Sequence, residues 1–263
     1  MNKSIIWYLR RHPILYRIRF TLLSKKTSVD RIEQFCYNQI NATTDIPPIY
    51  SELNLLIFEK TKAVLSDLDK AKKIAIWLRN NCKGGPGLGK SSSYTLRKMM
   101  NGEGGVCSDF SQVFNNFCVI NDLKVKEWGL KIKSNDPCIK GGHAFNEIYS
   151  KEFQKWILID VAKSILFHPI NPTVPSSVFD LIQSKKENKE IYFSSFNAKN
   201  TMDCKRITDL YLTSNSSPFV ITNYCNKTYD ACLDTLKFLP EPIIHGLLFL
   251  IGKSYVFEFP KSK

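Results

Sequence analysis

Three side chains in the middle of the chain could together carry out nucleophilic chemistry. Cys107 follows a turn that contains Gly104 and Gly105 and precedes an apolar helical pattern, so it is predicted at a helix N-terminus. A helix N-terminus and a neighbouring imidazolium both favour the thiolate, the nucleophilic form of cysteine. His143 would supply the imidazole, and Asp160 would orient that ring, fix its tautomer and stabilise its charge.

Each of these residues also has a structural interpretation when taken alone. Cys107 could be a small buried side chain, His143 an ordinary strand histidine, and Asp160 the end of a strand. Their coincidence, each in the right local context, favours a nucleophile, an acid/base and an orienting carboxylate in that order. The backbone N–H of Cys107 would then be available to an oxyanion.

The elements that must position these residues are predicted from hydrophobic periodicity. Residues 66–81 have the pattern of a helix, with Ser66 as its cap and an apolar stripe along one face. Beyond Cys107, apolar side chains recur at helical spacing up to residue 120, which predicts a buried helix. Alternating or continuous apolar runs predict three strands, at residues 126–133, 143–149 and 155–162.

The second and third of these strands are separated by a short polar link, which predicts a hairpin. A four-residue turn at 150–153, closed by Tyr149 and Gln154, would place His143 directly opposite Asp160. Directly opposite residues share a face of the sheet, with Cβ atoms ~4.5–5.5 Å apart. This register predicts an imidazole beside a carboxylate at the open end of the hairpin.

A glycine-rich stretch upstream spells a nucleotide-binding pattern, G-x-x-x-x-G-K-S over residues 84–91. A phosphate-binding loop of this kind requires a buried strand before it, whereas a helix is predicted here. The apolar run 156–160, which ends in an aspartate, is the one feature that favours an ATPase. The other interpretations are a loop near the active-site cleft, acting as a lid or substrate contact, and a plain surface linker.

The motifs around the three residues resemble the transglutaminase-like superfamily of cysteine enzymes. The resemblance is carried by GGVCSDFSQVFNNFC, then GGHAFNEIY, then WILIDVA, and it extends over roughly residues 60–165. It implies an α+β, papain-related fold, with the cysteine at the start of a buried helix packed on an antiparallel sheet. It also implies thiol acyl-transfer chemistry and, by motif position, catalytic roles for Cys107, His143 and Asp160.

The chain departs from the family's pattern at Phe145, where the family most often has tryptophan, and this leaves the subfamily and substrate open. Trp77 and Tyr94 are the candidates for a side chain that completes the oxyanion site.

Composition and patterning divide the chain into three parts. Residues 1–50 form a basic N-terminal arm with helices, residues 51–170 the transglutaminase-like core, and residues 171–263 a C-terminal extension packed on that core. Within the arm, residues 28–40 carry apolar side chains at roughly helical spacing. No internal repeat or low-complexity tract is found.

Chain length, net charge and cysteine content limit the kinds of partner and the cellular compartment that we expect. The chain has 263 residues and a net charge of +13, so an anionic surface is a plausible partner. The arm, residues 1–26, could make a peripheral contact with an anionic membrane, while no nucleic acid is expected. The N-terminus lacks the pattern of a signal peptide and no apolar run could span a bilayer, which predicts a cytoplasmic protein. Eight cysteines without a C-x-x-C motif predict free thiols and no metal site, and no cofactor is expected.

The sequence therefore predicts a thiol enzyme that acts on a protein or peptide. Cys107 would attack a carboxamide or peptide carbonyl, and His143 would protonate the leaving amine. Resolution of the acyl-enzyme by water would make a protease, amidase or deamidase, and resolution by an amine a transglutaminase. Hydrolysis is favoured because water needs no second binding site. The alternatives are a non-catalytic module that binds a membrane or anionic polymer through its basic surface and, less favoured, a P-loop ATPase.

Overall fold

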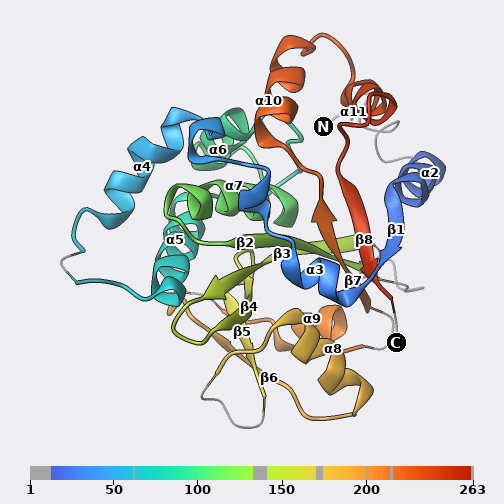
Figure 1. Cartoon of the computed structure of the whole chain (residues 1–263). Coiled ribbons are helices and arrows are strands. Elements are labelled where there is room, and N and C mark those ends of the chain that lie inside the picture. The colour runs from blue at the N-terminus through green and yellow to red at the C-terminus, as the bar shows by residue number, and fades with distance from the viewer. Residues whose placement is uncertain are drawn as a thin grey trace.

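One mixed sheet runs through the molecule in the order β1-β8-β7-β2-β3-β4-β5-β6 (Figure 1). The computed structural model describes residues 13–61, 63–132, 141–169, 174–199, 201–213 and 216–261. Neighbouring strands are antiparallel, except that β1 and β8 are parallel at one edge. The strands are β1 (Ser24–Thr27), β2 (Val125–Ile132), β3 (Gly141–Ser150), β4 (Lys155–Asp160), β5 (Ile165–His168), β6 (Tyr192–Ser195), β7 (Ser216–Thr222) and β8 (Val256–Pro260).

Four helices cover one face of the sheet (Figure 1). They are α4 (Pro48–Phe58), α5 (Asp67–Asn81), α6 (Ser92–Met100) and α7 (Cys107–Ile120). Ser66 caps α5 as predicted, because its Oγ accepts a hydrogen bond from the Asp69 N–H at 3.1 Å. The largest apolar core lies between these helices and the sheet, with Phe114 and Phe117 of α7 fully buried in it. The predicted buried helix after Cys107 is therefore confirmed.

The opposite face is covered by α3 (Val29–Gln34), α8 (Val178–Lys186) and α9 (Cys204–Tyr211). A second apolar core lies there and includes Trp128, Phe145 and Phe167 from the strands. Because β3 and β4 are buried on both faces, their sequences are apolar on both faces apart from a few polar residues. His143, Asn146 and Asp160 are among these polar residues and belong to the site described below.

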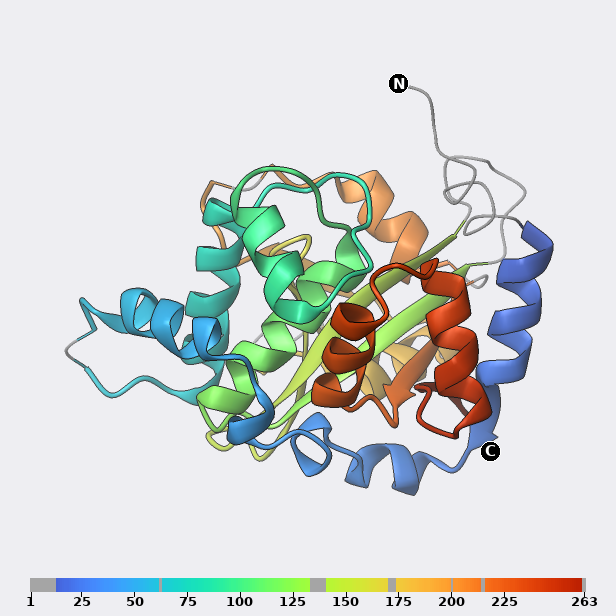
Figure 2. The same cartoon turned by 90° about the horizontal axis from the view of Figure 1, so that it is seen from above.

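The first and the last strand of the chain pair with each other at the β1–β8 edge. There α2 (Pro13–Leu23) packs on β8, and α10 (Asn226–Thr235) and α11 (Glu241–Leu250) form a small third core with Tyr255 (Figure 2). The last part of the chain contributes β7, which pairs directly with β2. Residues beyond 171 thus supply strands to the same sheet as the predicted core. Residues 1–12 of the arm lie outside the described residues.

The interpretation of residues 28–40 as one helical stretch is wrong. The helix α3 ends at Gln34, and Phe35 adopts an extended conformation (φ −66°, ψ 143°), followed by a 3-10 turn at Tyr37–Gln39. Phe35 packs against the second core, which requires the chain to leave the helix there. No helix within the described ranges combines the length and apolar character needed to cross a bilayer. The seven cysteines in those ranges are free thiols, and Cys138 lies outside them.

Candidate active site

Cys107 is the first residue of α7, where the sequence predicts it. The preceding turn uses positive φ angles of +149° at Gly104 and +130° at Gly105. A Cβ atom would lie 2.6 Å from the Pro86 carbonyl oxygen at Gly104, and 2.8 Å from Met99 Cγ at Gly105. The turn therefore requires glycine at both positions. It starts the helix at Cys107, where backbone N–H groups have no partner within the helix and the helix dipole favours a thiolate.

The β3–β4 hairpin exists, but its predicted register is wrong. Ser150 pairs with Lys155, so the turn is one residue later than predicted, and Gln154 ends it in the left-handed region at φ +54°. His143 is consequently diagonal to Asp160 rather than directly opposite. Because the pairing changes by two positions, both side chains remain on the same face, and diagonal neighbours are within reach of long side chains.

The first part of β3 leaves room for the cysteine. In the described register, β4 pairs with β3 from Asn146 onward, and the earlier residues pair with β2. Cys107 lies against this stretch: its sulfur accepts a hydrogen bond from the Ala144 backbone N–H and is hydrogen-bonded to the side chain of His143. The site is thus located where the two strands of the hairpin separate.

A short hydrogen bond joins the histidine to the carboxylate. His143 Nε2 donates to Asp160 Oδ2 at 2.7 Å, and both side chains are buried. Since Nε2 is engaged, Nδ1 is the ring nitrogen available to the thiol of Cys107. The structure brings the three predicted residues together in the order thiol, imidazole and carboxylate.

The electrostatics of this chain favour a thiolate–imidazolium pair. Burial would raise the pKa of the Cys107 thiol, but the hydrogen bond and positive charge of His143, together with the Ala144 N–H, lower it below its ordinary value. Burial would likewise lower the pKa of His143, but the Asp160 carboxylate and the Cys107 thiolate raise it to about 10. Opposite shifts of the two partners are expected when each stabilises the charged form of the other.

Asp160 is held by three donors in a fully buried position. Its Oδ2 accepts the His143 bond and a second bond from the Tyr211 hydroxyl at 2.8 Å, while its Oδ1 accepts from the Lys163 N–H at 2.9 Å. Burial would raise the pKa of Asp160, but the His143 charge and these donors hold it below its ordinary value. Tyr211 was not predicted, because it lies about fifty residues along the chain and no local motif relates it to Asp160.

A polar strip lies between α7 and the sheet, one and two turns along the helix from Cys107. Asn146 Nδ2 donates to the Ser111 carbonyl oxygen at 3.2 Å and to Asn115 Oδ1 at 2.8 Å, and Asn115 Nδ2 donates to Glu127 Oε2 at 2.9 Å. Burial raises the pKa of Glu127 to about 8, and the negative charge of Cys107 adds to the rise. Glu127 therefore holds its proton to a higher pH than an exposed glutamate does.

The glycine-rich loop lies against the turn that carries Cys107. The Gly85 N–H donates to the Gly105 carbonyl at 2.8 Å, and the Gly105 N–H donates to the Pro86 carbonyl at 3.0 Å. The Leu88 N–H contacts the Asp109 carboxylate in the first turn of α7 at 3.3 Å. These hydrogen bonds hold the glycine-rich loop against the turn before Cys107.

The same loop lacks the context of a phosphate-binding loop. Helix α5 precedes it instead of a strand, and the N-terminus of α6 is already occupied by a carboxylate. The Ser92 N–H donates to Asp230 Oδ1 at 2.6 Å, and the Ser92 hydroxyl donates to Asp230 Oδ2 at 2.5 Å. A phosphate would have to displace this half-buried carboxylate, so the structure argues against the ATPase alternative.

Of the two candidate oxyanion side chains, Trp77 lies away from the thiol. The Trp77 ring packs on Phe117, ten residues and thus about 15 Å along α7 from Cys107. Tyr94 is 45% exposed and stacks with the Lys98 ammonium. The backbone N–H groups at the start of α7, where Cys107 is the first residue, remain candidate donors to an oxyanion.

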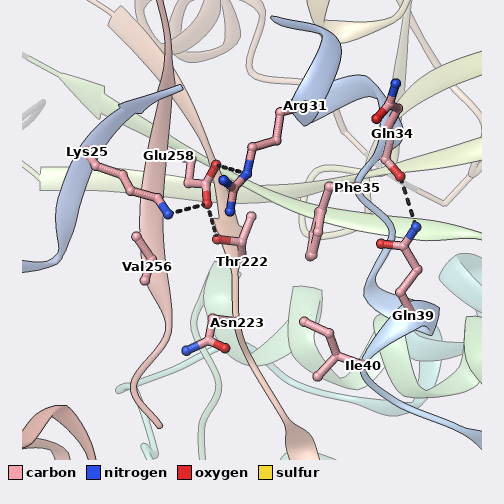
Figure 3. Close-up of a pocket in the computed structure, with 10 residues that line it drawn as sticks. All are labelled: Lys25, Arg31, Gln34, Phe35, Gln39, Ile40, Thr222, Asn223, Val256 and Glu258. Atoms are coloured by element: carbon pink, nitrogen blue, oxygen red, sulfur yellow. Dashed lines mark hydrogen bonds and ion pairs between the residues drawn. The ribbon is translucent and has the colours of Figure 1, made fainter. Parts of the chain in front are cut away.

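A separate open pocket of about 550 Å³ lies between α3, β7 and β8 (Figure 3). Two basic side chains of the pocket form ion pairs with one carboxylate. Lys25 Nζ lies 3.0 Å from Glu258 Oε1, and Arg31 Nε lies 3.7 Å from Glu258 Oε2. The pocket contains neither the thiol nor its partners. No group of three or more His, Cys, Asp or Glu side chains within the described ranges could hold a metal ion.

Comparisons with known proteins find one family model and one solved structure that are similar to parts of this chain. The sequence signature of the transglutaminase-like superfamily matches residues 55–161, which include Cys107, His143 and Asp160. No curated protein matches the chain. Among solved structures, the chain is similar to a candidate cysteine protease from Cytophaga hutchinsonii, with a TM-score of 0.34 and 17% identity over 64% of this chain. The chain covers 57% of that protein's length.

The match extends from the end of α4 to the residue after Asp160, so it contains the cysteine helix and the hairpin that carry the site. Residues 55–161 therefore carry the sequence signature of the transglutaminase-like superfamily.

Proposed function

We propose that the protein is a thiol acyl-transfer enzyme that hydrolyses a carboxamide or peptide bond. The observation that carries the proposal is the hydrogen-bonded chain from Cys107 through His143 to Asp160, in which the pKa of a largely buried thiol is lowered. Burial alone would have the opposite effect, so the neighbours are arranged to activate the sulfur.

The reaction follows from the positions of these groups. The Cys107 thiolate attacks the carbonyl carbon, and the negative charge that develops on oxygen is stabilised by N–H groups at the start of α7. The C–N bond then breaks as the His143 imidazolium gives its proton to the departing amine, which leaves a thioester on Cys107. Water attacks the thioester, His143 accepts a proton from that water, and the carboxylic acid and thiolate are released.

The substrate class that fits this chemistry is a protein or peptide that presents a side-chain or backbone amide. An amine in place of water would give a transamidated product through the same thioester. Water requires no second binding surface, and this supports hydrolysis as the proposed outcome.

The test is to incubate the protein with a glutamine-containing dipeptide and a peptide mixture, with and without hydroxylamine. Ammonia or free carboxylate without added amine would support hydrolysis, and hydroxamate formation alone would support transamidation. Cys107→Ala must abolish either product, and Cys204→Ala, which removes an exposed thiol, is the matched control. Turnover that survives Cys107→Ala would refute the proposal.

A further inference from the structure

The carboxylate of the site is completed by a tyrosine from outside the matched core. Tyr211 is the last residue of α9 and is fully buried, and its hydroxyl donates to the same Asp160 oxygen that accepts from His143. The distances from Oδ2 are 2.8 Å to the tyrosine and 2.7 Å to the histidine.

The ring of Tyr211 also fixes the position of the imidazole. Its centroid lies 5.8 Å from that of His143 in an edge-to-face arrangement, and Phe145 and Phe167 pack against the other sides at 5.4 and 4.7 Å. A hydroxyl held this rigidly can keep a hydrogen bond without losing further side-chain entropy.

We propose that Tyr211 is a positioning residue that keeps Asp160 ionised and aimed at His143. A buried carboxylate tends to take up a proton, and a neutral Asp160 would leave the imidazolium without its counter-charge. The inference rests on the proposed function of Cys107. It also gives residues beyond 171 a part in the site that the core alone would lack.

The test compares Tyr211→Phe with the wild type by the rate of Cys107 alkylation as a function of pH. The acid limb is the low-pH side of the alkylation-rate profile, where the Cys107 thiol becomes protonated. Loss of a hydrogen bond to a charged group should move this limb upward by about one pH unit. Tyr229→Phe, which removes a buried hydroxyl bonded to Ser254 at 3.3 Å, is the matched control and should leave the profile unchanged.

The outcomes separate this proposal from the proposed function. An acid limb that is identical in Tyr211→Phe and the wild type would overturn the role of Tyr211, while the proposed function would stand if Cys107 remained far more reactive than other thiols. Loss of selectivity for Cys107 in the wild type itself would overturn both. Thermal unfolding of each variant shows whether packing has changed, and a shift in melting temperature without a shift of the acid limb also counts against the proposal.

A second, independent inference concerns the part of the molecule that contains α2 and α11. Helices α2 and α11 lie next to each other there (Figures 1 and 2), and both contact one ring: Arg19 lies 5.4 Å from the Tyr255 centroid, and the His245 ring lies 6.0 Å from it. Each helix has a buried face and an exposed apolar stripe. The exposed side chains are Ile14, Ile18 and Leu22 on α2, and Ile243, Leu247 and Leu250 on α11.

These stripes are large for a protein surface. The α2 side chains are 51–62% exposed, Leu250 is 79% exposed, and Phe238 in the α10–α11 connection is 75% exposed. Exposed apolar side chains that follow one face of a helix in this way favour an interaction site. The surrounding charge identifies the partner: residues 13–28 contain four basic and no acidic residues, and Lys237 and Lys253 flank α11.

We propose that this end of the molecule docks on an anionic lipid bilayer. The apolar stripes would enter the headgroup region, and exposed cations such as Arg17 and Lys26 would contact acidic lipid headgroups. Helices with one apolar and one basic face bind membranes in this manner, and the two contributions reinforce each other.

The test is co-sedimentation with vesicles of phosphatidylcholine alone and with 30% phosphatidylglycerol. Binding is expected only to the anionic vesicles, and it should weaken as salt is added. Leu247→Glu/Leu250→Glu should lower the partition coefficient at least tenfold, and Arg17→Gln/Lys26→Gln should lower it severalfold. The matched control is Leu55→Glu/Leu56→Glu on α4, where the same residue type is 74% and 60% exposed.

Equal binding by the α4 and α11 variants, or no binding of the wild type to anionic vesicles, would overturn the lipid proposal. A concentration-dependent dimer in solution that the α11 variant abolishes, without vesicle binding, would assign the surface to a second copy of the chain and also overturn it.

Discussion

At the scale of the residue, the neighbours of Cys107 lower the pKa of its thiol. Burial raises the pKa of a thiol, and that of Cys82 reaches about 12 in this same protein. Cys107 differs because His143 and the Ala144 N–H stabilise its charged form. The identity of the three residues was predictable, since each occupies a recognisable local context. Tyr211 was not, because only the folded chain brings it to Asp160.

The substitution Asp160→Asn tests the carboxylate at this scale. The asparagine side chain would keep the size of the aspartate but remove the charge that raises the pKa of His143, so the imidazolium should lose its proton at lower pH. We expect alkylation of Cys107 at pH 6 to fall by about tenfold or more, since one pKa unit corresponds to a factor of ten in populations. Unchanged alkylation would separate Asp160 from thiol activation.

At the scale of the element, the site depends on where strands and turns begin and end. The helices and strands around it were predictable from periodicity, because each carries a clear apolar pattern. The hairpin register was not, since a four-residue turn fits at 150–153 or 151–154 and the left-handed conformation of Gln154 decides between them. Either turn keeps His143 and Asp160 on the same face of the sheet, because the strand pairing changes by two positions.

The turn before Cys107 gives a prediction of stability. Gly104→Ala would place a Cβ 2.6 Å from the Pro86 carbonyl at φ +149°, so we expect a loss of about 2 kcal/mol or more in the free energy of unfolding. Gly246→Ala is the contrast: it lies inside α11 with no atom within 4 Å of the new Cβ, and should stabilise by roughly 0.5–1 kcal/mol. Denaturant unfolding measures both, and equal effects would contradict the steric account.

Glu127 on β2 gives a prediction of pH dependence. The folded protein keeps its proton up to about pH 8, whereas an unperturbed glutamate loses it near pH 4.5. Between these pH values the chain takes up a proton when it folds. The free energy of unfolding of the wild type therefore falls by roughly 1.4 kcal/mol for each unit of pH increase. A glutamine at position 127 does not titrate. Asn146, which pairs with residue 127 across the two strands, has a buried Oδ1 without a hydrogen-bond partner in the described structure. The glutamine amide could donate a hydrogen bond to that oxygen.

We therefore expect Glu127→Gln to gain stability relative to the wild type as the pH rises from 5 to 8, measured from denaturant midpoints. Glu59→Gln, at an exposed position after α4, is the control and should show no such trend. A constant difference between Glu127→Gln and the wild type across this range would show that Glu127 is ionised in the folded state.

At the scale of the whole molecule, the matched core is not a separate unit. β7 pairs with β2, β8 pairs with β7, and α9 covers the face that holds His143 and Asp160. Composition could predict an extension after residue 171, but not that its strands enter the central sheet. Long-range strand pairing depends on complementary surfaces far apart in sequence, which local patterns do not encode.

A chain ending at residue 169 tests this organisation. It would lack β6, β7, β8 and the helix that carries Tyr211, so Trp128 and Phe145 would lose part of their core. We expect it to lack a cooperative thermal transition by circular dichroism and to lose the selective reactivity of Cys107. A cooperative melt with preserved reactivity would show that the core folds alone.

The central claim is that Cys107 and His143 form a thiolate–imidazolium pair, and the most direct test is residue-resolved alkylation of the folded protein from pH 4 to 9, read by mass spectrometry. The account predicts that Cys107 reacts far faster than the other thiols at pH 6 and loses this advantage in His143→Ala, while the exposed Cys204 is unaffected by the substitution. A Cys107 that reacts no faster than Cys204 at pH 6, or that keeps its rate without His143, would contradict it.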